Sequence, residues 1–179
     1  MHCRCRSGFD GRRPGEPAKM GEPNGPWRIA DITLDEHTVV RRSRDIEHER
    51  AVAIFDLLEE NHFKPTSGVA GPYHLHLAVE ENRLNIEIRS AVDGENETIV
   101  LALAPFRGIV RDYFMVCESY YEAIRRSSLT QIEAIDMGRR SLHNEGSSLL
   151  IERLADKVEV DLDTARRLFT LICVLHLRG

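Results

Sequence analysis

Long apolar runs and motifs of known chemistry are both missing from this chain of 179 residues. Its most apolar stretch, LFTLICVLHL at 168–177, is far shorter than the roughly 18 residues that a membrane-spanning helix needs. The sequence also lacks the patterns GxxxxGK[ST], GxGxxG, GxSxG, HExxH and CxxC. We therefore predict a protein outside the membrane with no cofactor, and no enzyme class is defined by a motif.

Lysine is scarce, with 3 residues against 21 arginines, and acidic residues outnumber basic ones by 29 to 24. Residues 1–26 hold five of the basic residues, so the remainder carries a formal net charge of −7. A domain this acidic repels phosphate backbones, so nucleic-acid binding is not predicted.

Residues 1–26 also concentrate 5 of the 12 glycines and 4 of the 7 prolines and contain no apolar run. Such a segment buries too little apolar surface to fold, so we predict a disordered tail followed by a single domain at 27–179. Met20 begins a shorter open frame, and we interpret residues 1–19 as an upstream extension from start-codon choice. Because the tail has no apolar core of 7–15 residues, a secretory signal is not indicated and a cytoplasmic protein is predicted.

The cysteines and histidines do not form a recognisable set of metal ligands. Cys117 and Cys173 lie in apolar helical patterns and are interpreted as buried free thiols. His74 and His76 share one face of a predicted strand, but no third ligand is evident nearby. No metal site is predicted.

Strands are predicted at 27–34, 73–79, 84–88 and 98–104, and the alternating apolar residues of the second and third predict an antiparallel hairpin. The stretch at 98–104 is apolar on both faces, which is typical of a central strand or of one covered by helices. The odd spacing of Ile29 and Ile32 suggests a bulge in the first strand.

Helical periodicity appears four times. The apolar stripe at 51, 54, 55 and 58 predicts a helix that Ser43 caps, and a second stripe runs from Phe106 to Ile124. A capping box at 130–133 opens a third region, which is either one helix through Gly146 or two helices that meet there. Asp161 caps the last helix. The predicted order is βαβββααα, an α+β fold with a small antiparallel sheet of three to four strands packed against helices.

The last helix is apolar almost all round over 168–177, so it is either central to the core or shared with a second subunit. The leading hypothesis is a small cytoplasmic interaction or regulatory module that self-associates through this helix.

The alternative is an enzyme or binding protein for a small anionic, phosphorylated metabolite. DMGRRSLHNE at 136–145 gathers a carboxylate, two guanidiniums, an imidazole and a second carboxylate. The general acid–base candidates are His143, Glu145 and Asp136, and Arg139 and Arg140 are the candidates for anion binding. A solvated helix face with ion pairs explains the same residues without any ligand.

A second anion site is suggested where the long helix begins, because helix N-termini present unpaired amides. Arg107 and Arg111 lie one turn apart there and are further anion-binding candidates. Pairing with acidic neighbours is the competing explanation.

Four strings resemble one known family. They are EHERAVAIFDLLEEN at 47–61, PFRGIVRDYFMVCESYYEAI at 105–124, QIEAIDMGRRSLHNEGSSLL at 131–150 and DTARRLFTLICVLHLRG at 163–179. Together they resemble the bacterial uncharacterised protein family UPF0262, from about Ile29 to the C-terminus. The resemblance implies a small bacterial cytosolic protein and assigns no activity, cofactor or catalytic residue.

Overall fold

The computed structural model describes residues 25–35 and 44–176. Nearly all of the predicted tail at 1–26 lies outside the described residues, and so does Ser43, the predicted cap of the first helix.

The chain folds as an α+β domain, which confirms the predicted class. In chain order its elements are β1 (Ile29–Leu34), α1 (Arg44–Glu59), β2 (Phe63–Pro65), β3 (Tyr73–Glu80), β4 (Arg83–Ser90), β5 (Asn96–Ala102), the short 3-10 helix η1 (Ala104–Phe106), α2 (Arg107–Arg126), α3 (Leu129–Leu154), β6 (Val158–Val160) and α4 (Leu162–His176).

The main sheet has the strand order β1-β3-β4-β5. Strand β5 is therefore at the edge, and residues 98, 100 and 102 on its outer face are exposed, so the prediction of a central or covered strand at 98–104 is wrong. The predicted hairpin is present as β3 and β4, paired in unbroken antiparallel register from Tyr73↔Ser90 to Glu80↔Arg83. Its tight turn places Glu81 and Asn82 at positive φ, the backbone conformation that two-residue hairpin turns require.

The sheet is mixed rather than wholly antiparallel, because β1 pairs with β3 in parallel. The chain between them passes through α1, and a crossover of this kind is what brings two neighbouring strands into parallel alignment. The predicted irregularity in β1 is present, since its register shifts between Ile29 and Asp31.

A second, two-stranded sheet was not predicted from the sequence. It pairs β2 with β6 in antiparallel register, Phe63 opposite Val160 and Pro65 opposite Val158. Phe63 and Val158 are buried, so this small sheet closes one side of the core.

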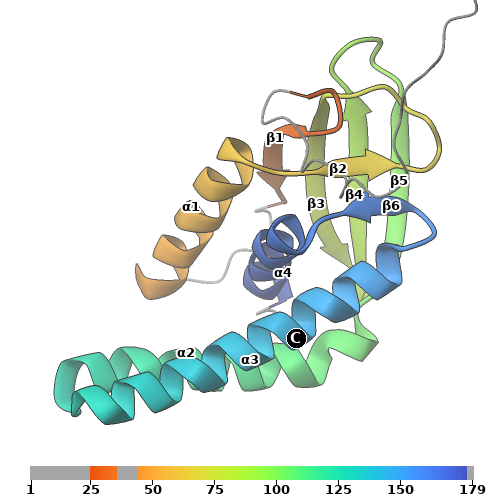
Figure 1. The fold of residues 1–179 in the computed structure, drawn as a ribbon. Helices are drawn as coiled ribbons and strands as arrows, with labels where there is room; N and C mark the ends of the chain where they lie inside the picture. Colours follow the sequence, from red (N-terminus) through yellow and green to blue (C-terminus); the bar gives the residue numbers. More distant parts are fainter. Residues whose placement is uncertain (1–24, 36–43, 177–179) are drawn as a thin grey trace, which may run out of the picture.

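Helix α4 occupies the centre of the domain, with α1 and α3 packed against it and the sheet beyond (Figure 1). Residues 168–175 are each no more than 7% exposed. The sequence left open whether this helix is central or shared, and its apolar surface is covered within one chain. Self-association through 168–177 stays a prediction, and residue 177 is outside the described part.

Helix α3 is a single helix of 26 residues, which resolves the alternative that the sequence left open. Its N-cap is Ser128, and the capping box joins Ser128 to Gln131 instead of spanning 130–133. Gly146 lies inside the helix. The ring of Phe169 occupies the space that a side chain would need, since a Cβ on Gly146 would lie 2.2 Å from it.

The apolar stripe of α1 is displaced from its predicted position. Ala53 and Leu57 are buried, whereas Phe55 is 62% exposed. The stripe that faces α4 is therefore 53, 54, 57 and 58, and part of the predicted stripe points to solvent.

No helix in the described ranges is long and apolar enough to span a bilayer.

Candidate functional site

The predicted anion-binding arginines of α3 are engaged by one carboxylate. Arg139 places Nη2 and Nε at 3.0 and 3.2 Å from Oδ1 of Asp136. Arg140 places Nε at 2.8 Å from the other oxygen, Oδ2. The ion-pair explanation weighed for this segment thus describes all three side chains.

Arg139 is further fixed by an aromatic ring. Its guanidinium lies over Tyr120 of α2, 4.9 Å from the ring centroid. Burial opposes the charge, but the hydrogen bond to Asp136 and the charges of Glu49 and Asp136 together outweigh it and raise the pKa of Arg139 above its usual value. This arginine therefore joins α3 to α2 as a permanent cation.

His143 of α3 lies between aromatic rings of two other helices, α2 and α4. It stacks on Tyr113 of α2 with centroids 5.5 Å apart and lies tilted against Phe169 of α4 at 5.7 Å. Its Nε2 is 2.9 Å from Oγ1 of Thr170. The Thr170 hydroxyl donates to the carbonyl of Arg166, so Nε2 carries the proton and donates to the threonine oxygen.

This environment favours the neutral ring. Burial lowers the pKa of His143, and burial with the nearby charge of Arg107 lowers the pKa of His176 as well. In the unfolded chain both histidines regain a pKa near 6.5. As the pH falls through that value the unfolded state takes up protons first, so the folded state loses relative stability.

We therefore expect the free energy of unfolding to decrease as the pH is lowered from 7 to 5, with a slope of at most about 1.4 kcal/mol per pH unit for each histidine. His143→Gln keeps a hydrogen-bond donor and does not titrate, so it should flatten the slope. Urea unfolding at a series of pH values measures both. A wild-type stability that is constant or rises toward pH 5 would show that His143 is not held neutral.

The other predicted site residues do not join this cluster. Arg107 is exposed, and Arg111 is bound to its neighbour Asp112 at 2.9 Å. Nine residues of helix separate Arg111 from Tyr120, the partner of Arg139, which is about 14 Å along the axis. Glu145 is exposed on α3. The structure thus does not bring the two predicted anion sites together.

One half-buried contact was not predicted from the sequence. The hydroxyl of Tyr121 on α2 donates to the carboxylate of Glu49 on α1, 72 residues earlier in the chain. Burial and this carboxylate raise the pKa of Tyr121, so the phenol stays protonated. The residue spacing within each helix does not predict this pair, because the pair depends on how α1 and α2 are placed relative to each other.

Beside this contact lies a hollow of about 350 Å³ between the start of α1 and α2. Its apolar lining includes Ile46, Phe114 and Cys117, and charged side chains such as Glu118 and Arg125 surround it. Burial raises the pKa of the Cys117 thiol to about 11, so the thiol stays protonated at neutral pH.

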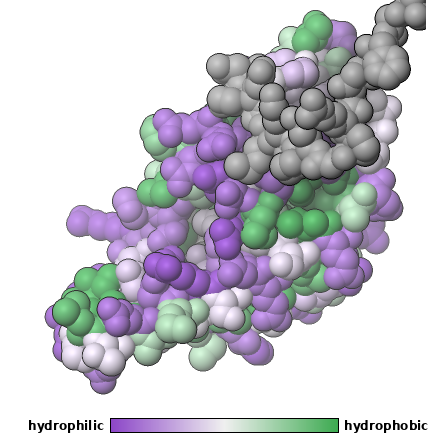
Figure 2. All heavy atoms as spheres, in the orientation of Figure 1, coloured by the Kyte–Doolittle hydropathy of each residue, from purple (hydrophilic) through white to green (hydrophobic). Residues whose placement is uncertain are grey.

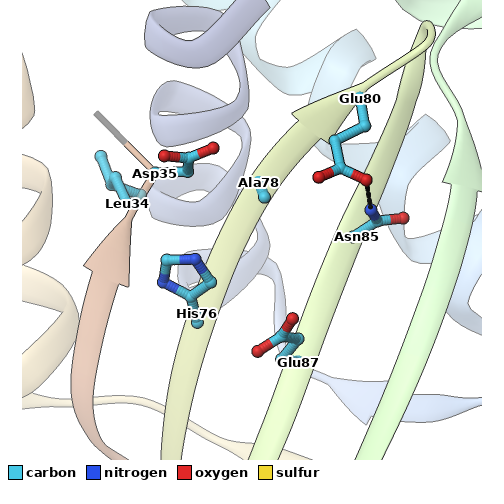
Figure 3. Close-up of a pocket in the computed structure, with 7 residues that line it drawn as sticks. All are labelled: Leu34, Asp35, His76, Ala78, Glu80, Asn85 and Glu87. Atoms are coloured by element: carbon cyan, nitrogen blue, oxygen red, sulfur yellow. Dashed lines mark hydrogen bonds between the residues drawn. The ribbon is translucent and has the colours of Figure 1, made fainter. Parts of the chain in front are cut away.

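The outer face of the main sheet carries a second, more polar hollow of about 600 Å³, shown in Figure 3. His76, Glu80 and Glu87 project into it from β3 and β4. Asn85 donates to Glu80 at 3.1 Å, and Nδ1 of His76 is 2.8 Å from the Thr33 hydroxyl. Acidic groups predominate there, which does not suit an anion.

His74, the second histidine of this face, lies 3.8 Å from the carboxylate of Asp31 on β1. Across residues 25–35 and 44–176, no three His, Cys, Asp or Glu side chains form a group that could hold a metal ion.

Comparisons with known proteins agree with one another. The chain is 57% identical to a UPF0262 protein of Rhizobium etli over 155 residues, which cover 87% of this chain and 98% of that protein. It is 61% identical to a UPF0262 protein of Rhodospirillum rubrum over 159 residues, covering 89% and 98%. It is 60% identical to a UPF0262 protein of Caulobacter vibrioides over 152 residues, covering 85% and 94%.

No solved structure matches this chain. Residues 26–178 match the family described as "Uncharacterised protein family (UPF0262)", whose name assigns no activity. The chain therefore belongs to the bacterial family UPF0262, whose function is unknown.

Proposed function

We propose that this chain is a binding module for another protein and that the outer part of the α2–α3 hairpin carries the binding surface. One observation supports this most strongly: not one residue from 124 to 145 is buried. A segment of this length usually contributes an apolar stripe to the core of its own domain. Here α2 and α3 run out beyond the other elements instead (Figure 1).

The apolar side chains of this segment are left in solvent. Ile124, Leu129 and Met137 are 52%, 78% and 73% exposed. Hydrophobic atoms gather at the tip of the hairpin, where α2 ends and α3 begins (Figure 2). Apolar groups with a charged surround are the usual composition of a protein-binding surface.

Charge indicates the kind of partner. The tip also carries Arg125 and Arg126, 67% and 78% exposed, each 3.6 Å from one carboxylate. At this exposure such ion pairs are weak, so both guanidiniums are available to a stronger acceptor. The partner that fits is a protein with an apolar groove flanked by carboxylates.

Binding of an anionic metabolite has less support. Asp136 already holds Arg139 and Arg140, and His143 is committed to Thr170. The two hollows described above are lined by other residues. Each of these side chains instead connects helices or covers a helix face.

Site-specific photo-cross-linking in the native cells tests the proposal. Benzoyl-phenylalanine at 129 or 137 should give a cross-linked product of one discrete mass. The same probe at Val92, which is 70% exposed on the turn before β5, should give none. Leu129→Glu should reduce the product formed from position 137 without lowering the melting temperature, because surface changes usually alter stability by less than about 0.5 kcal/mol.

Absence of a product at both hairpin positions would overturn the proposal. The same product at Val92 would overturn it as well, since the contact would then not be specific to the hairpin.

A further inference from the structure

The two outer strands of the main sheet differ in how they are protected. Natural sheets blunt their edges with bulges, charges, proline or very short strands, because an open edge pairs with other chains. At one edge, β1 has a register shift between Ile29 and Asp31 and carries a carboxylate on its outer face. The register shift and the carboxylate both discourage another chain from pairing with β1.

The other edge, β5, has neither a bulge nor a proline, and its one charge, Glu97, is engaged by Ser67. Its sequence NETIVLA contains no proline, lysine or arginine, and its seven residues pair with β4 without a register shift. Among the described residues its backbone pairs with no strand other than β4, which leaves the opposite edge of β5 without a strand neighbour. In Figure 1 it is the outermost strand, and α2 and α3 lead away from it.

The side chains of β5 also favour pairing. Thr98 and Val100 are exposed on the outer face, Val100 at 47%, whereas Ile99 and Leu101 point into the core. β-branched residues side by side are among the better cross-strand neighbours in sheets. Glu97, the single charge of the strand, accepts a hydrogen bond from Ser67.

We propose that β5 pairs with β5 of a second copy of this chain, antiparallel about a two-fold axis at Ile99. Only this register aligns all seven residues of one strand with all seven of the other. It sets Thr98 opposite Val100 and Glu97 opposite Leu101, so no like charges meet. The two four-stranded sheets then form one continuous sheet of eight strands.

This surface is distinct from the α2–α3 hairpin and from 168–177, so the inference stands or fails separately from the proposed function. A two-fold axis perpendicular to the sheet leaves both sets of helices on the same side of it. The exposed outer face, with Thr98 and Val100, stays accessible.

The test measures oligomeric state and register together. Light scattering of the full chain at tens of micromolar should give twice the chain mass of 20.4 kDa. Thr98→Lys with Val100→Lys puts like charges opposite each other in the proposed register and should give monomers. Thr98→Glu with Val100→Glu should do the same.

Mixing the two variants in equal amounts should restore the dimer, because each lysine then faces a glutamate. Both positions are exposed, so the folded state should survive, and circular dichroism checks this. Hydrogen exchange of wild-type residues 96–102 needs no variant and should slow as protein concentration rises.

A wild-type monomer, a Lys variant that folds and stays dimeric, or exchange that does not depend on concentration would each overturn the proposal. A mixture that stays monomeric would overturn the register.

Discussion

Gly146→Ala is expected to lower the free energy of unfolding by about 1–3 kcal/mol, the usual range for overpacking a close contact. The new Cβ would lie 2.2, 2.4 and 2.6 Å from three atoms of the Phe169 ring. No real Cβ contact is that short, so α3 and α4 must move apart or the ring must turn. The ring is fully buried among Tyr113, His143 and the core, which leaves it little room.

Gly138→Ala is the matched control two turns earlier in the same helix. A Cβ there meets nothing within 4 Å. Alanine is the better helix former by roughly 1 kcal/mol, so this variant should be as stable as the wild type or more stable. Urea unfolding of the two variants should therefore give opposite signs. Equal effects at both glycines would show that α3 and α4 are not in the close contact described here.

Phe169→Ala is expected to cost about 3–5 kcal/mol, because it removes a large ring from a fully buried site and leaves a cavity. The same ring is what excludes a side chain at Gly146. In the Phe169→Ala background, Gly146→Ala should therefore lose its penalty and become neutral or stabilising.

A double-mutant cycle measures this coupling, with all four free energies of unfolding taken from urea melts at one pH. If the penalties of the two substitutions simply add, the glycine and the ring do not share the space that the structure gives them.

The β3–β4 hairpin could be predicted because its signal is local. Leu75, Leu77, Leu84 and Ile86 alternate with polar residues, and a two-residue turn joins the strands, so strand, register and face all follow from neighbouring positions. The cap of α4 is equally local: Asp161 accepts a hydrogen bond from the amide of Thr164 at 2.9 Å.

Features that depend on contacts between distant segments could not be predicted. β2 and β6 have three residues each, too few for a periodic pattern, and each strand exists because the other pairs with it. The parallel pairing of β1 depends on the path of α1. Gly146 is compatible with a helix end or a helix interior until Phe169 is placed against it.

The candidate site shows the same division. That Asp136, Arg139 and Arg140 share one helix face follows from their spacing, and so does their pairing. The environment of His143 could not be predicted from that spacing, because the rings that contact it come from α2 and α4. The segment at 136–145 that the sequence analysis singled out lies where α3 meets α2 and α4, and a catalytic role for its residues stays a prediction.

The central claim is that the hairpin surface binds a protein while the His143 cluster serves the fold. It is tested most directly by the affinity of the purified cross-linked partner for three variants of the full chain. Leu129→Glu with Met137→Glu should weaken binding at least tenfold, whereas His143→Gln and Val92→Glu should leave it unchanged. Unchanged affinity in the hairpin variant, or a tenfold loss in His143→Gln at a pH where it remains folded, would contradict the account.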